Sequence, residues 1–314
     1  MMSNNSAFVF PGQGSQSVGM LDSVKSKFSE VSALTTEASD ILGYDIASLI
    51  ADGPAEQLNE TEYTQVAMLV SDVIFYRIIQ KHRPQHPIAM AGHSLGEYAA
   101  LVCANALRFS DAIKLVAERG RIMQETIPKG KGAMAAVIGL DEASIEKICR
   151  ESSNHSEQVV AANYNAVGQI VIAGHTDAVH KAVAAAEKSG AKMAVIIPVS
   201  VPCHCPLLEP AAHEFSKTLA KTPFHPPEFP VLSNIDAIAY KDEQDIRERL
   251  TRQLYMPVQW VATINVFTEI EIDTVIECGP GKTLSGLIKR IDRKIKLKSA
   301  ADILNDVADT RICS

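Results

Sequence analysis

The sequence predicts an α/β protein, with a large subdomain built around a short, mostly parallel sheet and a smaller βαββαβ subdomain inserted into it. Three observations lead to this class. Strand-like and helix-like stretches alternate in the first part of the chain, two strands then follow each other directly, and the βα pattern resumes later with "IDTVIECGPG". Alternation of this kind is typical of a parallel sheet with helical crossovers.

The composition indicates a folded globular chain. Of its 314 residues, 46% are hydrophobic and 21% are charged, which suffices for a sizeable core and is too apolar for a disordered chain. The net charge of −7 disfavours nucleic acid as the main partner, because phosphate binding needs a broad basic surface. We therefore expect no nucleic-acid partner.

The N-terminal segment "MMSNNSAFVF" does not resemble a signal peptide. It contains no Lys or Arg before Lys25, and its apolar run ends at Pro11-Gly12. No stretch of the chain approaches the ~18 consecutive apolar residues that span a bilayer. We expect a cytoplasmic protein without a membrane partner.

The first part of the large subdomain, residues 1–128, starts with the short strand "AFVF", which ends at Pro-Gly. A helix-like stretch covers residues 61–82, and "PIAMAGHS" is a second strand that enters a turn. The next helix is expected to begin after Phe109, with Ser110 as its N-cap, and to end near Thr126.

The middle of the chain predicts six elements in the order of a ferredoxin-like fold. They are a strand, a helix, two strands joined by a glycine-containing turn, a helix and a last strand: "AMAAVIGL", "DEASIEKICRES", "EQVVAANYN", "QIVIAG", "TDAVHKAVAAAEKSG" and "KMAVIIPVS". We place this inserted subdomain at residues 129–200 and the second part of the large subdomain at residues 201–314. No low-complexity linker separates them, so the two subdomains are expected to pack closely.

Six cysteines are scattered along the chain, which in a reducing compartment indicates free thiols rather than a disulfide framework. They are Cys103, Cys149, Cys203, Cys205, Cys278 and Cys313. The triplet Cys203-His204-Cys205 invites a zinc interpretation, but three consecutive side chains rarely point at one ion, and no paired CxxC or HxxxH lies nearby. We expect no metal site.

The stretch "AGHSLGEYAA" places Ser94 between Gly92 and Gly96, where a strand turns into a helix. This pattern matches the GxSxG elbow of α/β-hydrolase-like folds, in which the serine hydroxyl is a nucleophile and the helix N-terminus presents backbone N–H groups beside it. The N–H of Leu95 would then be one donor to an oxyanion. A serine that only caps a helix would explain the same residues.

A serine nucleophile needs a base, and the chain has nine histidines. His93 is adjacent to the serine and is expected to point away from it, as neighbours in an extended strand do. His204 follows the apolar run "AVIIPVSV" in the turn "VPCHCP", the kind of strand-end loop where α/β sites gather. Its position alone leaves open that His204 is a loop histidine bonded to the backbone.

Two arginines of the helix that ends near Thr126 differ in their periodicity. At spacings of three and four residues, Arg119 shares its stripe with apolar side chains, whereas Arg121 aligns with charged ones and is expected to be solvated. A guanidinium on the apolar face needs a negative partner or several acceptors. A stem that reaches water or an internal ion pair would satisfy the same pattern.

Seven blocks, taken together and in order, resemble those of the malonyl-CoA:acyl carrier protein transacylases, the loading enzymes of fatty-acid synthesis. The blocks are "FVFPGQGSQ", "GHSLGEYAALVCA", "RGRIMQ", "NYNAVGQIVIAG", "VSVPCHCPLL", "QLYMPVQW" and "ECGPGKTLSGLIKR". They run from Phe8 to about Arg290, nearly the whole chain, and several are individually specific.

The resemblance implies a role for each matching position. Ser94 would carry the acyl group, with His204 as its base. The second ring nitrogen of this histidine would be held by a backbone carbonyl, at Gln253 in "QLYMPVQW", rather than by a carboxylate. The backbone N–H of Gln13 in "FPGQGSQ" would join that of Leu95 in the oxyanion hole.

Arg119 matches the arginine that binds the free carboxylate of the substrate, a task that suits a planar fork able to donate two parallel hydrogen bonds. Gly120 beside it costs ~1 kcal/mol relative to Ala in a helix interior, so we expect a close backbone approach there. The chain departs from the family at two places, with Ala166-Val167 where Ser-Pro is usual and Met256 where Asn is usual.

The implied reaction transfers malonyl from malonyl-CoA to the phosphopantetheine thiol of acyl carrier protein through a malonyl-serine, without a cofactor. Lys289 and Arg290, in the basic run "KRIDRKIKLKS", are candidates to dock the acidic carrier protein, with a solvated basic segment as the alternative. We expect a monomer. The residues alone also allow a serine esterase or thioesterase that uses water, and a non-catalytic acyl-binding module.

Overall fold

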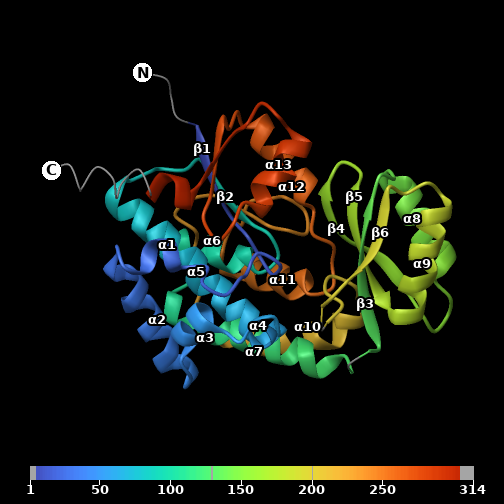
Figure 1. Ribbon diagram of the computed structural model, residues 1–314, viewed down its shortest axis with the longest axis horizontal. Coiled ribbons are helices and arrows are strands. Elements are labelled where there is room, and N and C mark those ends of the chain that lie inside the picture. Colours follow the sequence, from blue (N-terminus) through green and yellow to red (C-terminus); the bar gives the residue numbers. More distant parts are fainter. Residues whose placement is uncertain (1–4, 129, 200, 305–314) are drawn as a thin grey trace.

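The computed structural model describes residues 5–128, 130–199 and 201–304, which form a large and a small subdomain (Figure 1). Residues 129 and 200, where we placed the subdomain boundaries, lie outside the described residues, and so does Cys313. The boundaries therefore stay a proposal. Among the described helices, none is long and apolar enough to cross a membrane.

A five-stranded parallel sheet forms the centre of the large subdomain, in the order β7-β2-β1-β8-β9. Phe10 pairs with Gly92, so β1 and β2 end at the same edge and the segments that follow them meet there. Ligands of open α/β sheets bind at this edge. The strands are β1 (Ser6–Phe10), β2 (Ala89–Gly92), β7 (Val231–Leu232), β8 (Thr274–Glu277) and β9 (Lys296–Ser299).

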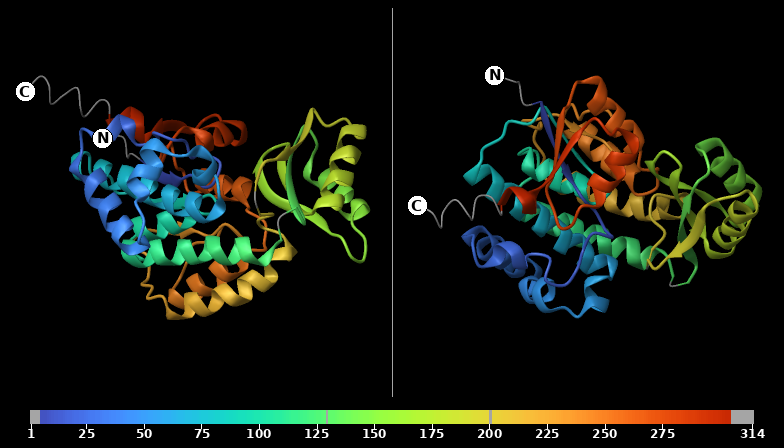
Figure 2. Two further views of the ribbon diagram at one scale, coloured as in Figure 1. Left: turned by 60° about the horizontal axis from the view of Figure 1, so that its bottom comes forward. Right: turned by 45° about the horizontal axis from the view of Figure 1, so that its top comes forward.

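Alternate residues of β1 point into two separate cores, as the pleat of a strand requires. Phe8 and Phe10 pack into a core with α5, α6 and α7, whereas Ala7 and Val9 pack into a second core with α12 and α13. Helices thus cover both faces of the sheet (Figure 2). The helices of the large subdomain are α1 (Asp22–Lys25), α2 (Ser29–Leu42), α3 (Ile46–Asp52), α4 (Ala55–Leu58), α5 (Thr61–His82), α6 (Gly96–Cys103), α7 (Phe109–Thr126), the 3₁₀ turn η1 (Pro206–Leu208), α10 (Glu209–Lys221), α11 (Glu243–Gln253), α12 (Trp260–Glu269) and α13 (Thr283–Ile291).

The small subdomain has the predicted βαββαβ order and forms an antiparallel sheet with the strand order β4-β5-β3-β6. Its two helices cover the face of the sheet that lies away from the large subdomain (Figure 1). The other face is turned toward the large subdomain. The elements are β3 (Gly132–Ile138), α8 (Glu142–Ser152), β4 (Val159–Ala166), β5 (Gln169–His175), α9 (Thr176–Lys188) and β6 (Met193–Ile197).

The helix expected over residues 61–82 is confirmed as α5, and the expected end of α7 at Thr126 is confirmed. The predicted N-cap at Ser110 is wrong, because α7 begins at Phe109. The side chain of Phe109 is buried, which anchors the helix start in the core, and the guanidinium of Arg108 binds Asp111 in the first turn at 2.8 Å.

Candidate active site

A sharp turn between β2 and α6 positions Ser94. Its backbone has φ +52°, in the left-handed region that is unfavourable for a residue with a side chain. The turn is crowded: a Cβ atom at Gly96 would lie 2.0 Å from the carbonyl oxygen of Phe10. Only glycine fits there, so α6 can pack closely on β1 and hold the serine at the strand edge.

Ser94 and His204 lie within hydrogen-bond distance, with 2.7 Å between Oγ and Nε2. The other ring nitrogen, Nδ1, lies 2.7 Å from the backbone carbonyl oxygen of Gln253. A carbonyl oxygen only accepts, so Nδ1 carries the proton and the lone pair of Nε2 faces the serine hydroxyl. The tautomer set by Gln253 is therefore the one in which His204 can take a proton from Ser94.

Burial keeps the imidazole of His204 neutral. Its exposed fraction is 2%, and burial, together with the positive charge of Arg119, lowers its pKa to about 3. At neutral pH the ring is therefore an available base rather than a cation. His204 also has φ +59°, so both partners of the pair are held in left-handed backbone conformations.

Arg119 lies on the buried face of α7, with an exposed fraction of 2%, so its stem does not reach water. Its Nη1 donates to Oε1 of Gln65 at 2.8 Å and its Nη2 to Oε1 of Gln253 at 3.1 Å, while the guanidinium lies 5.4 Å from the ring centre of Tyr98. Two amide oxygens thus hold the charge. In the described part of the chain, no carboxylate forms an ion pair with it and its Nε atom has no hydrogen-bond partner.

The neighbours of Arg119 behave as expected. Arg121 is exposed and forms ion pairs with Glu118 and Glu125, at 2.7 and 2.5 Å. A Cβ atom at Gly120 would lie 2.8 Å from the Cα atom of Glu62, which confirms the close approach of backbones, here between α7 and α5.

The segments that carry Gln13 and Leu95 meet at the edge of the sheet. Gln13 lines the same cleft as Ser94, and a Cβ atom at Gly12 would lie 2.4 Å from the carbonyl oxygen of His93. Over the described ranges, neither the N–H of Gln13 nor that of Leu95 donates to a protein acceptor. Both donors are thus available to a bound group.

The cleft beside Ser94 has a volume of about 590 Å³ and lies between the subdomains. His93 points away from Ser94, as predicted: its Nε2 lies 2.7 Å from Oδ1 of Asn165, and its ring packs edge-on against Trp260. The small subdomain contributes part of the lining through Met134, Asn163, Asn165, Val171, Ile197, Pro198 and Val199.

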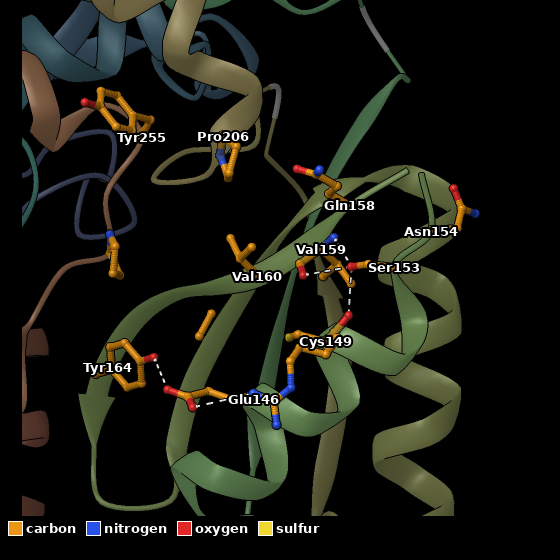
Figure 3. A pocket seen from close by; sticks show the side chains of 13 residues that line it. Glu146, Cys149, Ser153, Asn154, Gln158, Val159, Val160, Tyr164, Pro206 and Tyr255 are labelled. Carbon is orange, nitrogen blue, oxygen red and sulfur yellow. Dashed lines mark hydrogen bonds and ion pairs between the residues drawn. The ribbon is translucent and has the colours of Figure 1, made fainter. Parts of the chain in front are cut away.

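A second cavity of about 580 Å³ lies between α8, β4 and the large subdomain (Figure 3). Tyr164 donates to Glu146 at 3.0 Å on one wall, and Pro206 and Tyr255 of the large subdomain form the opposite wall. Its lining contains no histidine, so no serine there has an imidazole base. The paired Ser94 and His204 identify the first cleft as the candidate active site.

The triplet Cys203-His204-Cys205 does not converge on one point. The thiol of Cys203 lies 3.5 Å from the carbonyl oxygen of Val201, and that of Cys205 lies 3.4 Å from the carbonyl oxygen of Pro202. Both ring nitrogens of His204 are already engaged. In the residues that the structure describes, no group of three or more His, Cys, Asp or Glu side chains is arranged to hold a metal ion.

Of the two family departures, Ala166-Val167 has no hydrogen bond to the serine or the histidine among the described residues. A backbone hydrogen bond at Met256, in contrast, raises the pKa of His204 against the larger effects of burial and Arg119. Ala166 ends β4 at the turn into β5, and Val167 in this turn is 73% exposed. The N–H of Met256 donates to the carbonyl of Arg252 at 2.9 Å, just after α11.

The docking candidates Lys289 and Arg290 lie in the last turn of α13, and both are exposed. Arg290 also donates to the side chain of Gln169 at the start of β5. It thereby connects the large subdomain to the small one.

Three polar residues that support the site were not among those predicted from the sequence. Asn234 accepts from the N–H of Ser94 at 2.6 Å, Glu97 accepts from Asn234, and Gln65 holds Arg119. Glu97 left a usable signal, because it is the one charged side chain of the short apolar helix α6, whereas Gln65 follows the polar start of α5 and has no such signal. Asn234 follows a strand of only two residues, which has no sequence signature.

Comparison with known proteins shows the family of the chain. The family model described as "Acyl transferase domain" matches residues 7–304. The chain is 50% identical over 285 residues to the malonyl CoA-acyl carrier protein transacylase of Escherichia coli K12, covering 91% of this chain and 92% of that protein. It is 39% identical over 298 residues to the protein of the same name from Bacillus subtilis, covering 94% and 93%.

Solved structures give the same relationship. The malonyl CoA-acyl carrier protein transacylase of Coxiella burnetii superposes with a TM-score of 0.95 at 45% identity, covering 99% of this chain and 98% of that one. A malonyl-transacylase solved in complex with a type II polyketide acyl-carrier protein gives a TM-score of 0.94 at 43% identity, covering 98% and 99%. By sequence and by fold, the chain belongs to the acyl transferase family, among the malonyl-CoA:acyl carrier protein transacylases.

Proposed function

We propose that this protein transfers the malonyl group of malonyl-CoA to the phosphopantetheine thiol of acyl carrier protein, through a malonyl ester on Ser94, and so supplies fatty-acid synthesis. The observation that carries the proposal is the series of contacts from Ser94 Oγ to His204 Nε2 and from His204 Nδ1 to the carbonyl of Gln253. The identity of the two substrates, malonyl-CoA and acyl carrier protein, is inferred from the similarity to the transacylases.

In the first half-reaction, Nε2 of His204 takes the proton of Ser94 as Oγ attacks the thioester carbonyl. The tetrahedral oxyanion would be held by the N–H groups of Gln13 and Leu95. Collapse of this intermediate breaks the carbon–sulfur bond, and the imidazolium returns its proton to the departing thiolate of coenzyme A. The products are malonyl-serine and free coenzyme A.

In the second half-reaction, the phosphopantetheine thiol gives its proton to Nε2 of His204 and attacks the malonyl-serine ester. The same two N–H groups hold the second oxyanion. When the carbon–oxygen bond breaks, the proton moves from the imidazolium to Oγ, which restores Ser94. Each complete half-reaction returns the imidazole of His204 to its neutral form, the form that burial favours.

The role proposed for Arg119 is to bind the free carboxylate of the malonyl group. Its guanidinium is buried and held by the amide oxygens of Gln65 and Gln253, while its Nε has no protein partner. A malonyl carboxylate would supply the anion that the described residues do not place in contact with it. This contact would favour malonyl over neutral acyl groups.

Intact-mass measurement after malonyl-CoA, and again after carrier protein, tests the function. We expect one malonyl adduct that is stable in water and is lost when carrier protein is added. Rapid loss of the adduct in water would instead indicate a serine esterase or thioesterase, and the lack of an adduct on folded protein would indicate a non-catalytic acyl-binding module.

The proposed partner protein would dock at the end of α13. Lys289 and Arg290 would steer the approach of the acidic carrier protein, since both are exposed cations at the end of α13. The proposed reaction needs no cofactor and no metal. We place the protein in the cytoplasm, as a monomer.

A further inference from the structure

Glu97 is a buried carboxylate at the centre of the hydrogen bonds behind the active site. It lies in the first turn of α6, three residues after Ser94, and is fully buried. Its Oε1 accepts from the N–H of Asn234 at 3.0 Å and from the hydroxyl of Tyr240 at 2.6 Å, and its Oε2 accepts from Nε2 of Gln253. Three donors from three segments thus converge on one side chain.

The side-chain amide of Gln253 connects this carboxylate to Arg119. Its Nε2 donates to Glu97 and to the carbonyl oxygen of Ser94, the latter at 2.9 Å, and its Oε1 accepts from Nη2 of Arg119. Two acceptors on one side leave only one orientation in which every polar atom is satisfied. The amide nitrogen must face Glu97, so the amide oxygen must face the guanidinium.

We propose that Glu97 is a positioning residue for malonyl recognition: by fixing the orientation of the Gln253 amide, it fixes the guanidinium of Arg119. This inference rests on the proposed function of Arg119. Glu97 is not in the lining of the cleft, and its hydrogen-bonded connection to the guanidinium of Arg119 runs through the side chain of Gln253. Because a bidentate contact with a carboxylate depends on the plane of the guanidinium, a change in the amide changes the selectivity for malonyl.

The orientation of the Gln253 amide is expected to be the same whether Glu97 is ionised or protonated. Burial raises the pKa of its carboxyl to about 7, so both forms exist near neutral pH. A proton on Oε1 can be donated to Tyr240, because a hydroxyl also accepts, and Oε2 still accepts from Gln253. A side-chain amide at position 97 could not accept hydrogen bonds on both sides, since its NH₂ group only donates.

The test is Glu97→Gln. With Oε1 of the new side chain accepting from Asn234, its NH₂ group would face the NH₂ group of Gln253, and the Gln253 amide must turn over. Arg119 then meets a donor in place of an acceptor. We expect the malonyl-to-acetyl ratio of Ser94 acylation rate constants, read by intact mass, to fall at least about tenfold, the loss expected for one charge-assisted hydrogen bond. We expect KM for malonyl-CoA to rise more than kcat falls.

Glu277→Gln is the matched control. Glu277 is also fully buried in the large subdomain, and it accepts from the N–H groups of Leu284 and Ser285, away from the cleft. The same chemical change there is expected to lower stability and to leave the malonyl-to-acetyl ratio unchanged. A fall in the ratio with both variants would show that any buried carboxylate has this effect, and the proposal would be wrong.

A double-mutant cycle separates positioning from a structural role. In a Gln253→Met background the amide is gone, so Glu97→Gln should cause no further fall in the ratio. If Glu97→Gln does not fold, Gln253→Met alone decides, because it should lower the ratio by itself. An unchanged ratio in folded Gln253→Met or Glu97→Gln, or full additivity in the cycle, overturns the inference. If the wild-type protein forms no malonyl adduct with malonyl-CoA, the proposed function itself is overturned.

Discussion

Nδ1 of His204 lies 2.7 Å from the backbone carbonyl oxygen of Gln253, in the place where a carboxylate stands in many serine hydrolases. A carbonyl selects the same tautomer of the ring as a carboxylate does, but it adds no full negative charge. With Arg119 close by, the imidazolium is disfavoured, which accounts for the lowered pKa of His204. Burial and the charge of Arg119 thus keep His204 neutral until it receives the proton of Ser94.

The first prediction concerns Ser94 and His204. Ser94→Ala should abolish the malonyl adduct, because Oγ of Ser94 is the hydroxyl that lies 2.7 Å from Nε2 of His204. His204→Ala should slow adduct formation by roughly two to four decades, the usual range for a lost general base. The measurement is intact mass over time after mixing with malonyl-CoA. An adduct that persists in Ser94→Ala, on another residue, would contradict the assignment.

The second prediction concerns pH. The pKa of His204 is about 3 when folded and should be near 6.5 when unfolded, so the unfolded chain binds the extra proton between these values. Stability therefore falls as the pH drops below 6.5, by about 2 kcal/mol at pH 5. His204→Asn should lack this loss. Denaturant unfolding of both proteins at pH 7.5 and 5 measures the difference, and equal pH dependence would show that the ring is not held neutral.

The third prediction is that Arg119 selects the substrate. Arg119→Ala leaves the malonyl carboxylate without its partner in a buried position, and should cost roughly 2–5 kcal/mol for malonyl transfer while acetyl transfer is kept or gained. Arg119→Lys should rescue little, because a point charge cannot reproduce the fork. The malonyl-to-acetyl ratio of kcat/KM is the measurement. Arg121→Ala, an exposed arginine of the same helix, is the control.

If malonyl and acetyl transfer fall together in folded Arg119→Ala, the arginine supports the fold. Another residue must then bind the carboxylate. Stability measured on the same preparations separates this outcome from partial unfolding.

The fourth prediction concerns docking. Reversing Lys289 and Arg290 to Glu should weaken transfer to carrier protein far more than transfer to a small pantetheine thiol, with an effect mainly on association rate and strongly dependent on salt. The same reversal at Lys147 and Arg150, which lie exposed on α8 of the small subdomain, is the control. Equal losses with both acceptors would contradict docking at α13.

Local sequence patterns determined much of the fold and the chemistry. The apolar run of α5, the βαββαβ order and the glycines around Ser94 are readable because each depends on neighbours in the chain. The apolar helix face on which Arg119 lies was also readable, since a helix has a fixed period, but the burial of its guanidinium was not. The pairing of Ser94 with His204 entered through the family resemblance, because 110 residues separate them.

Only the tertiary structure decided which polar groups meet behind the cleft. Glu97, Asn234 and Gln253 come from segments far apart in the chain, and their hydrogen bonds span separations of 137 and 156 residues. No periodicity links such positions, since long-range contacts depend on how strands are ordered in the sheet. The wrong N-cap at Ser110 has the same origin: capping propensity is local, but the start of α7 was set by the burial of Phe109 in a core that distant segments build.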